Sequence, residues 1–155
     1  MKIEVSNGEI LDKHTILRIK AEKLHDAGAL GNVQRELDAL GSAVDQIVAQ
    51  CPQSEALQEC IEALTATNTK LWEVEDALRE LERTQDFGPE FIALAREVYF
   101  TNDARAAIKK SINQLTGSAL VEEKSYKDYR WLSDSQRFGL HSLNVKEQLW
   151  AYTNA

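Results

Sequence analysis

The sequence predicts an all-α protein, and two features carry that prediction. Its 155 residues include only two prolines and seven glycines, so long segments run without a helix breaker. Within these segments apolar residues recur at spacings of three and four, which is the period of an α-helix. We expect an elongated antiparallel bundle of about four long helices, partly coiled-coil in pattern, with an aromatic-rich C-terminal tail packed on it.

The first helix is predicted to begin after Ser6, because Ser6 followed by Glu9 forms a capping box. It should run to about His25. Its apolar stripe would consist of Ile10, His14, Leu17, Ala21 and Leu24.

The second helix is expected after a turn bracketed by Gly28 and Gly31, and Pro52 should end it near Cys51. Its stripe keeps a regular heptad spacing. The members are Leu30, Val33, Leu37, Leu40, Val44, Ile47 and Cys51.

The third helix is expected to be capped by Ser54. A helix of about thirty residues would be about 45 Å long, which favours an elongated body. Its stripe consists of Leu57, Cys60, Leu64, Thr67, Leu71, Val74, Leu78 and Leu81.

The fourth helix should start at Pro89, where the missing N–H costs little, and end near Gly117. A separate helix capped by Asn102 is the alternative, because Asn is better at helix starts than inside helices; the continuous helix is favoured. The stripe consists of Phe91, Leu94, Val98, Thr101, Arg105, Ile108, Ile112 and Leu115.

The chain after Gly117 loses this periodicity but holds six of the eleven aromatic residues. Such a content argues against disorder, so we expect the tail to pack on the bundle or on a second subunit. We predict a helical bundle over residues 1–126 and a tail over 127–155 that is not an independent domain. The six aromatics are Tyr126, Tyr129, Trp131, Phe138, Trp150 and Tyr152.

Charge and hydropathy argue against several classes of partner. The net charge is −7, and seven acids crowd residues 73–90, which would repel nucleic acid and anionic membrane surfaces. No apolar run approaches a membrane span or a signal peptide, so we expect a cytoplasmic protein. Cys51 and Cys60 should then be reduced core residues.

No motif for a metal or cofactor stands out. Glu22 and His25 match the Glu-x-x-His of di-iron bundles, but that chemistry needs a second pair, which is absent. Lys109 and Lys110 are explained by the dipole at a helix C-terminus. We therefore predict no metal, no cofactor and, on balance, no enzymatic activity.

Polar residues in three stripes are predicted to meet in one layer. In antiparallel neighbours the position numbers of facing residues have a nearly constant sum, which places Thr67 opposite Arg105 and, through Leu40, His14 beside them. The candidate ligand-binding residues around this layer are Arg105, Asn102, Thr101, Thr67, Asn68, His14, Glu75 and Glu97.

A buried guanidinium needs a carboxylate, water or a ligand, and the stripes themselves do not supply the acid. One interpretation is that the layer fixes the register of the helices, as polar core residues do in coiled coils. A second is a pocket for a small anionic ligand. A third is that the register is wrong and Arg105 faces solvent.

Five segments, 5–13, 71–76, 97–105, 115–118 and 121–126, resemble an uncharacterised family of small bacterial all-helical proteins, a domain of unknown function. The resemblance covers roughly residues 1–126. It implies a bacterial cytoplasmic protein and supplies no reaction. His14 departs from the pattern of that family, which favours Arg105 over His14 as a functional residue.

Two functions remain open from the sequence. The first is an interaction or structural module that binds another protein or a second copy of itself, with the aromatic tail as a candidate interface. The second is a small anionic-ligand binder or bundle enzyme built around Arg105, with Asn102, Thr101, Glu75 or Glu97 beside it.

Overall fold

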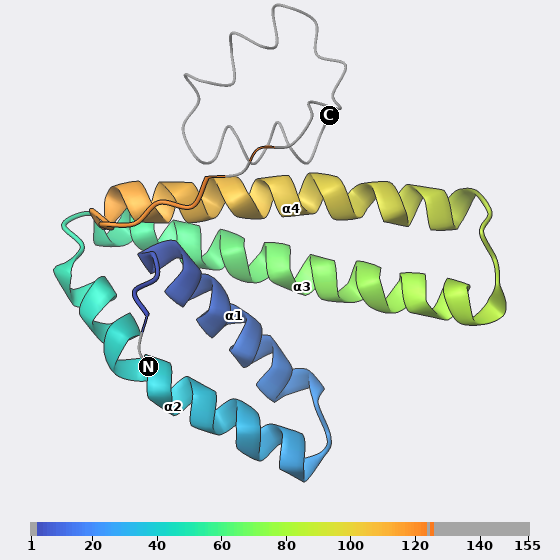
Figure 1. Ribbon diagram of the computed structural model, residues 1–155, viewed down its shortest axis with the longest axis horizontal. Helices are drawn as coiled ribbons and strands as arrows, with labels where there is room; N and C mark the ends of the chain where they lie inside the picture. The colour runs from blue at the N-terminus through green and yellow to red at the C-terminus, as the bar shows by residue number, and fades with distance from the viewer. Residues whose placement is uncertain (1–2, 124, 126–155) are drawn as a thin grey trace, which may run out of the picture. The chain divides into compact units, whose positions relative to one another are not determined.

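The computed structural model describes residues 3–123 and 125, which form four α-helices and no strand. The helices are α1 (Asn7–Lys23), α2 (Ala27–Gln50), α3 (Ser54–Thr84) and α4 (Pro89–Leu115) (Figure 1). All four belong to one compact unit, Met1–Val121. The all-α prediction is confirmed, whereas the predicted packing of the tail lies outside the described residues.

Two helix starts follow the predicted signals. The Ser6 hydroxyl oxygen accepts a hydrogen bond of 3.3 Å from the backbone N–H of Glu9, as an N-cap does. Pro89 is the first residue of α4. At the other end of α4, Gly117 adopts a positive φ of 60°, the left-handed conformation that glycine supplies after a helix.

The fourth helix is continuous through Asn102, so the alternative of a separate helix there is wrong. The Asn102 side-chain amide donates a hydrogen bond of 3.0 Å to the Val98 carbonyl one turn earlier. The amide thus bonds back along its own helix and does not cap a new one.

Two predicted starts are wrong. Helix α2 begins at Ala27, because Asp26 is its N-cap and accepts a hydrogen bond of 2.7 Å from the N–H of Ala29. The glycines expected to form a turn therefore lie inside the helix. In α3, Ser54 is the first helical residue and not the cap, which is Gln53.

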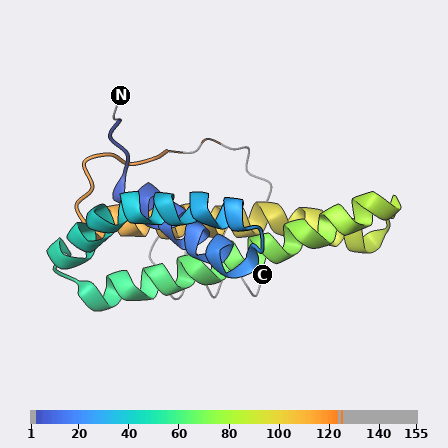
Figure 2. The ribbon, with the colours of Figure 1, turned by 90° about the horizontal axis from the view of Figure 1, so that it is seen from below.

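Helix α1 is the common neighbour of the other three helices. Helices α3 and α4 form a long antiparallel hairpin, and α1 packs on both of them while α2 packs mainly on α1 (Figures 1 and 2). Helix α2 contacts α3 only weakly. The predicted alignment of α3 with His14 through α2 is therefore wrong, because α1 packs on α3 directly.

The inward face of α1 is not the predicted stripe. Ile10 and His14 are only half-buried and Ala21 is exposed, whereas Leu17 is buried as expected. Because α2 covers one side of α1 and the α3–α4 hairpin covers another, two stripes overlap on this helix. The buried residues of α1 are Gly8, Leu11, Asp12, Thr15, Leu17 and Ile19.

Burial is deepest where α1 covers the α3–α4 hairpin and decreases toward the α3–α4 turn. Leu57 and Leu64 of α3 and Ile108 and Ile112 of α4 are almost completely buried.

We call residues 74–98 the arm. Both ribbon views show it extending past α1 and α2 (Figures 1 and 2). Its apolar seam is buried at Val74 and only half-buried beyond it, at Leu78, Leu81, Phe91, Leu94 and Val98.

No helix in the described part of the chain is both long and apolar enough to cross a membrane.

Candidate functional site

A glycine brings α1 and α4 into close backbone contact. A Cβ at Gly8 would lie 2.6 Å from the Lys109 carbonyl oxygen, closer than real Cβ atoms approach. The N–H of Gly8 also donates a hydrogen bond of 2.7 Å to the side-chain oxygen of Asn113. This approach places the next turns of α1 opposite Lys109 and Arg105.

Asp12 is the acid that pairs with the half-buried guanidinium of Arg105. Its side chain is only 3% exposed, and its two oxygens accept hydrogen bonds from Arg105, at 2.9 Å from Nε and 2.5 Å from Nη2. This two-point pairing is the strong geometry for arginine and carboxylate. The pair joins the first helix to the last.

Asn68 attaches the third helix to the same carboxylate. Its amide nitrogen donates to an Asp12 oxygen and to the Thr15 hydroxyl oxygen, each at 2.9 Å. The Thr15 hydroxyl in turn donates to the backbone carbonyl of Asp12 at 2.8 Å. One buried network therefore contains side chains of α1, α3 and α4.

A second ion pair lies one turn away. Lys109 is buried, with 8% of its side chain exposed, and pairs with Glu9; its ammonium nitrogen is also 4.0 Å from an Asp12 oxygen. We call this group, which contains two acids and two cations, the polar cluster. Its members are Glu9, Asp12, Thr15, Asn68, Arg105 and Lys109.

Two predicted members of the layer, Thr67 and His14, are not among the residues of the polar cluster. The Thr67 hydroxyl donates to the Ala63 carbonyl of its own helix at 2.7 Å. His14 is half-buried, and burial is the main cause that lowers the pKa of its imidazole, with the nearby Arg18 second, while Asp45 acts in the opposite direction.

The remaining candidates lie on α3 and α4 outside the polar cluster. Thr101 is buried. Glu75 pairs with Arg79 at 3.1 Å on the surface of α3, and Glu97 pairs with Lys70 between α3 and α4. The two glutamates are thus engaged on the helix surface.

Neither cysteine forms a disulfide, and both are buried. The Cys51 thiol donates to the Leu115 carbonyl with a separation of 3.6 Å. Burial raises the pKa of the Cys60 thiol, with smaller contributions from Glu59 and Cys51. These are properties of unreactive core thiols. Among the described residues no group of three or more His, Cys, Asp or Glu is arranged to hold a metal ion.

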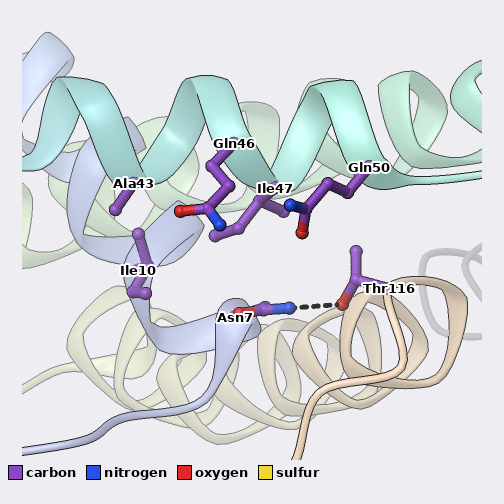
Figure 3. A pocket seen from close by; sticks show the side chains of 7 residues that line it. All are labelled: Asn7, Ile10, Ala43, Gln46, Ile47, Gln50 and Thr116. Carbon is purple, nitrogen blue, oxygen red and sulfur yellow. Dashed lines mark hydrogen bonds between the residues drawn. The ribbon is translucent and has the colours of Figure 1, made fainter.

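A shallow pocket of about 220 Å³ lies between α2 and the chain ends of α1 and α4 (Figure 3). None of its lining side chains is charged, and Asn7 donates a hydrogen bond of 3.0 Å to Thr116 across its floor. The pocket could hydrogen-bond a ligand but offers it no counter-charge. It is lined by Asn7, Ile10, Ala43, Gln46, Ile47, Gln50 and Thr116.

The first N–H groups of α1 are already bonded, so this helix start offers no free anion site. The N–H of Asn7 donates to the Ser118 hydroxyl oxygen at 3.1 Å, that of Gly8 to Asn113, and that of Glu9 to Ser6. These are the donors that would otherwise bind an anion at a helix N-terminus.

Sequence reasoning missed Asp12, Glu9 and Lys109. Lys109 was explained by the dipole at the helix C-terminus alone. The signal for Asp12 was present, since Gly8, Asp12, Thr15 and Ile19 recur at helical spacing. The stripe that begins at Ile10 and ends at Leu24 is more apolar, so the prediction placed that stripe on the buried face instead.

Fold and site together define an all-helical bundle protein in which charges of the first and last helices pair with one another and an amide of the third helix joins them. The chain belongs to DUF6165, a family of unknown function whose model matches residues 1–136. The resemblance inferred from the sequence is confirmed. Comparisons with curated proteins and with solved structures find no match.

Proposed function

We propose that this protein is a non-enzymatic interaction module whose arm docks on another protein chain, either a different protein or a second copy of itself. The observation that carries the proposal is the half-buried seam of the arm. Two packed helices cover only one side of each other, and a bundle normally closes around its apolar side chains with a third or fourth helix.

Exposed apolar side chains near the α3–α4 turn support the same proposal. Phe87 is 52% exposed and stacks edge to face on Phe91, with 5.3 Å between ring centroids. Ile92 is 56% exposed. Aromatic and aliphatic side chains adjoining a half-covered seam are typical of protein-binding surfaces.

A structural role for the polar cluster fits this non-enzymatic proposal. Its carboxylates and cations are equal in number, and Asp12 is held by Arg105 and Asn68 at once. Such a network fixes which residues of three helices face one another, since any shift in register would leave buried charges unpaired.

The proposal is tested by placing a photoreactive amino acid at Ile92 and, as a matched control, at Val48, an exposed apolar residue of α2. Irradiation in cells that make the protein should give a cross-linked adduct at position 92, to be identified by mass spectrometry, and little at position 48. No adduct at position 92, or equal adducts at both, would contradict the proposal.

A second candidate is a site for a small anionic ligand at Arg105. It is favoured by one observation: 28% of the Arg105 side chain stays exposed although the guanidinium is bonded to Asp12. Thermal shifts measured with a panel of anionic metabolites test it. Stabilisation that Arg105→Ala abolishes and Lys20→Ala retains would support the site; absence of any shift in the wild type counts against it.

A further inference from the structure

The groove that holds α1 continues into the arm. Asn68 and Arg105 touch α1, and residues seven and fourteen positions away on the same helix, about two and four turns, project in nearly the same direction. Toward the α3–α4 turn these are Glu75 and Glu82 on α3. On α4 they are Val98 and Phe91.

Helix α1 ends before it reaches the arm. Its last residue, Lys23, has its ammonium nitrogen 4.0 Å from a carboxylate oxygen of Glu73, just before the arm begins. Beyond this point the groove floor is formed by side chains that are half-buried, namely Leu78, Phe91, Ala95 and Val98. From Pro89 to Val98 the groove is about 15 Å long, enough for about three turns of another helix.

The arm carries much of the negative charge of the chain. Residues 74–98 contain seven acids against three arginines, a net charge of −4 out of −7 for all 155 residues. Arg79 and Arg83 are engaged with acids of their own helix. Glu82 and Glu90 are exposed and, in the part of the chain that the structure describes, have no cationic partner.

Helix α1 shows which charge suits this groove. Its segment 13–23, which approaches the arm, contains Lys13, Arg18, Lys20 and Lys23 against one acid, Glu22, a net charge of +3. Lys13 pairs with Glu36 of α2 at 2.7 Å, whereas Lys23, at the end of α1, lies against α3 of the hairpin. Lys23 beside Glu73 is the contact where the two charge patterns meet.

We infer that the arm groove binds a basic amphipathic helix of another protein, which takes the position of a third helix beyond the end of α1. The inference rests on the proposed interaction function and names the partner's chemistry. Apolar side chains of that helix would cover Leu78, Phe91 and Val98, and its Lys or Arg would face Glu75 and Glu82. A second copy of the arm is the poorer occupant, because it brings a charge of −4 against −4.

The test measures binding of a fluorescent peptide of about 14 residues, with leucines at helical spacing and lysines elsewhere, to the full chain by anisotropy. A short helix in a groove of this length buries little area, so the expected Kd is micromolar. The same peptide with glutamates in place of the lysines should not bind. Glu82→Lys and Val98→Ser should each weaken binding of the lysine peptide about tenfold, or about 1.4 kcal/mol.

Matched variants separate the groove from general attraction to an acidic protein. Glu55→Lys makes the same charge change in the first turn of α3, and Val48→Ser makes a similar apolar change on α2. Both should bind the peptide like the wild type, with unchanged circular dichroism in all four variants. Equal weakening by Glu55→Lys and Glu82→Lys would overturn the inference, as would absence of binding.

Sedimentation of the chain alone distinguishes failure of the basic-helix inference from failure of the proposed interaction function. A concentration-dependent dimer that Ile92→Ser dissolves would identify a second copy as the occupant and overturn the inference, while leaving the interaction function intact. A cross-link from position 92 to a partner without a basic helix would do the same. A wild-type monomer that binds the lysine peptide supports the inference.

Discussion

Asp12 is a single carboxylate on which three helices depend. It accepts hydrogen bonds from Arg105 of α4 and Asn68 of α3, and it is itself part of α1. Removing its charge would take the carboxylate counter-charge away from the half-buried Arg105 guanidinium. Because breaking a buried pair from one side costs far more than an exposed pair contributes, this residue should dominate any scan of the polar positions.

The variant Asp12→Asn keeps the shape of the side chain and removes its charge. We expect it to lower the free energy of unfolding by about 2–4 kcal/mol, the lower values applying if water reaches the partly exposed Arg105. Urea denaturation measures the change. The control is Glu36→Gln, which breaks the exposed 2.7 Å pair with Lys13 and should cost less than about 1 kcal/mol. Equal effects of the two variants would show that the buried pair does not contribute.

His14 gives the stability a dependence on pH. Its pKa is lowered in the folded protein, first by burial and then by Arg18, so the unfolded chain binds a proton more readily. Its stabilising contribution is complete above the unfolded pKa of about 6.5 and is lost as the pH falls through the folded value. Urea titrations between pH 7.5 and 5 should show a smaller loss of stability for His14→Gln than for the wild type; parallel profiles would contradict this assignment.

At the scale of elements, the contact of α1 with α4 depends on one missing side chain. In Gly8→Ala the new methyl group would meet the Lys109 backbone oxygen, and backbone yields less readily than a flexible side chain. We expect a loss of about 1–3 kcal/mol in the free energy of unfolding, because α1 and α4 must move apart.

The matched control is Gly41→Ala in the interior of α2, where nothing lies within 4 Å of the added Cβ. Alanine is the better helix former, so this variant should be stabilised by about 0.5–1 kcal/mol. Thermal unfolding of the two variants should therefore shift in opposite directions. Destabilisation by both would mean that the loss at Gly8 does not come from the close approach.

The elements themselves were largely predictable, because local signals decide them. Ser6, Pro52 and Pro89 act on the backbone beside them, and the stripes of α3 and α4 identify the deeply buried residues of the hairpin. The start of α2 was not predicted, because two glycines suggest a turn while Asp26, the actual cap, is an unremarkable acid. A cap bond outweighs the modest cost of glycine inside a helix.

The site was predictable only in part, because tertiary packing decides it. Arg105 and Asn68 were expected near one another and are both in the polar cluster. Asp12 was missed, since α1 is covered on two sides and a single stripe was assumed. The predicted order of neighbours placed α2 between α1 and α3, whereas α1 packs on α3 directly. No local sequence signal indicates which other helices a given helix will pack against.

At the scale of the whole helical unit, the α3–α4 hairpin has two environments. Near Leu64 and Ile108 it is covered by α1, whereas from Leu78 to Leu94 it consists of two helices alone. Amide hydrogens of the arm should therefore exchange faster than those of residues 57–71 and 104–112, because the arm can open without breaking the buried core.

Hydrogen exchange followed by mass spectrometry checks this difference along α3 and α4. Saturating amounts of the lysine peptide should slow exchange in the arm and leave residues 57–71 unchanged. Uniform protection of both helices in the protein alone would show that the arm is as firmly held as the rest.

The hydrogen bonds of Gly8 with Asn113 and of Asp12 with Arg105 also determine the order in which the helices can pack during synthesis. The partners of α1 lie about a hundred residues later in the chain, so a ribosome must translate nearly all of α4 before the charges at the start of the chain are neutralised. Until then α1 can associate only with α2 and α3, which leaves Asp12 without its cation. Completion of α4 is therefore the step that closes the fold, and pairings so distant in sequence make that step slow relative to helix formation.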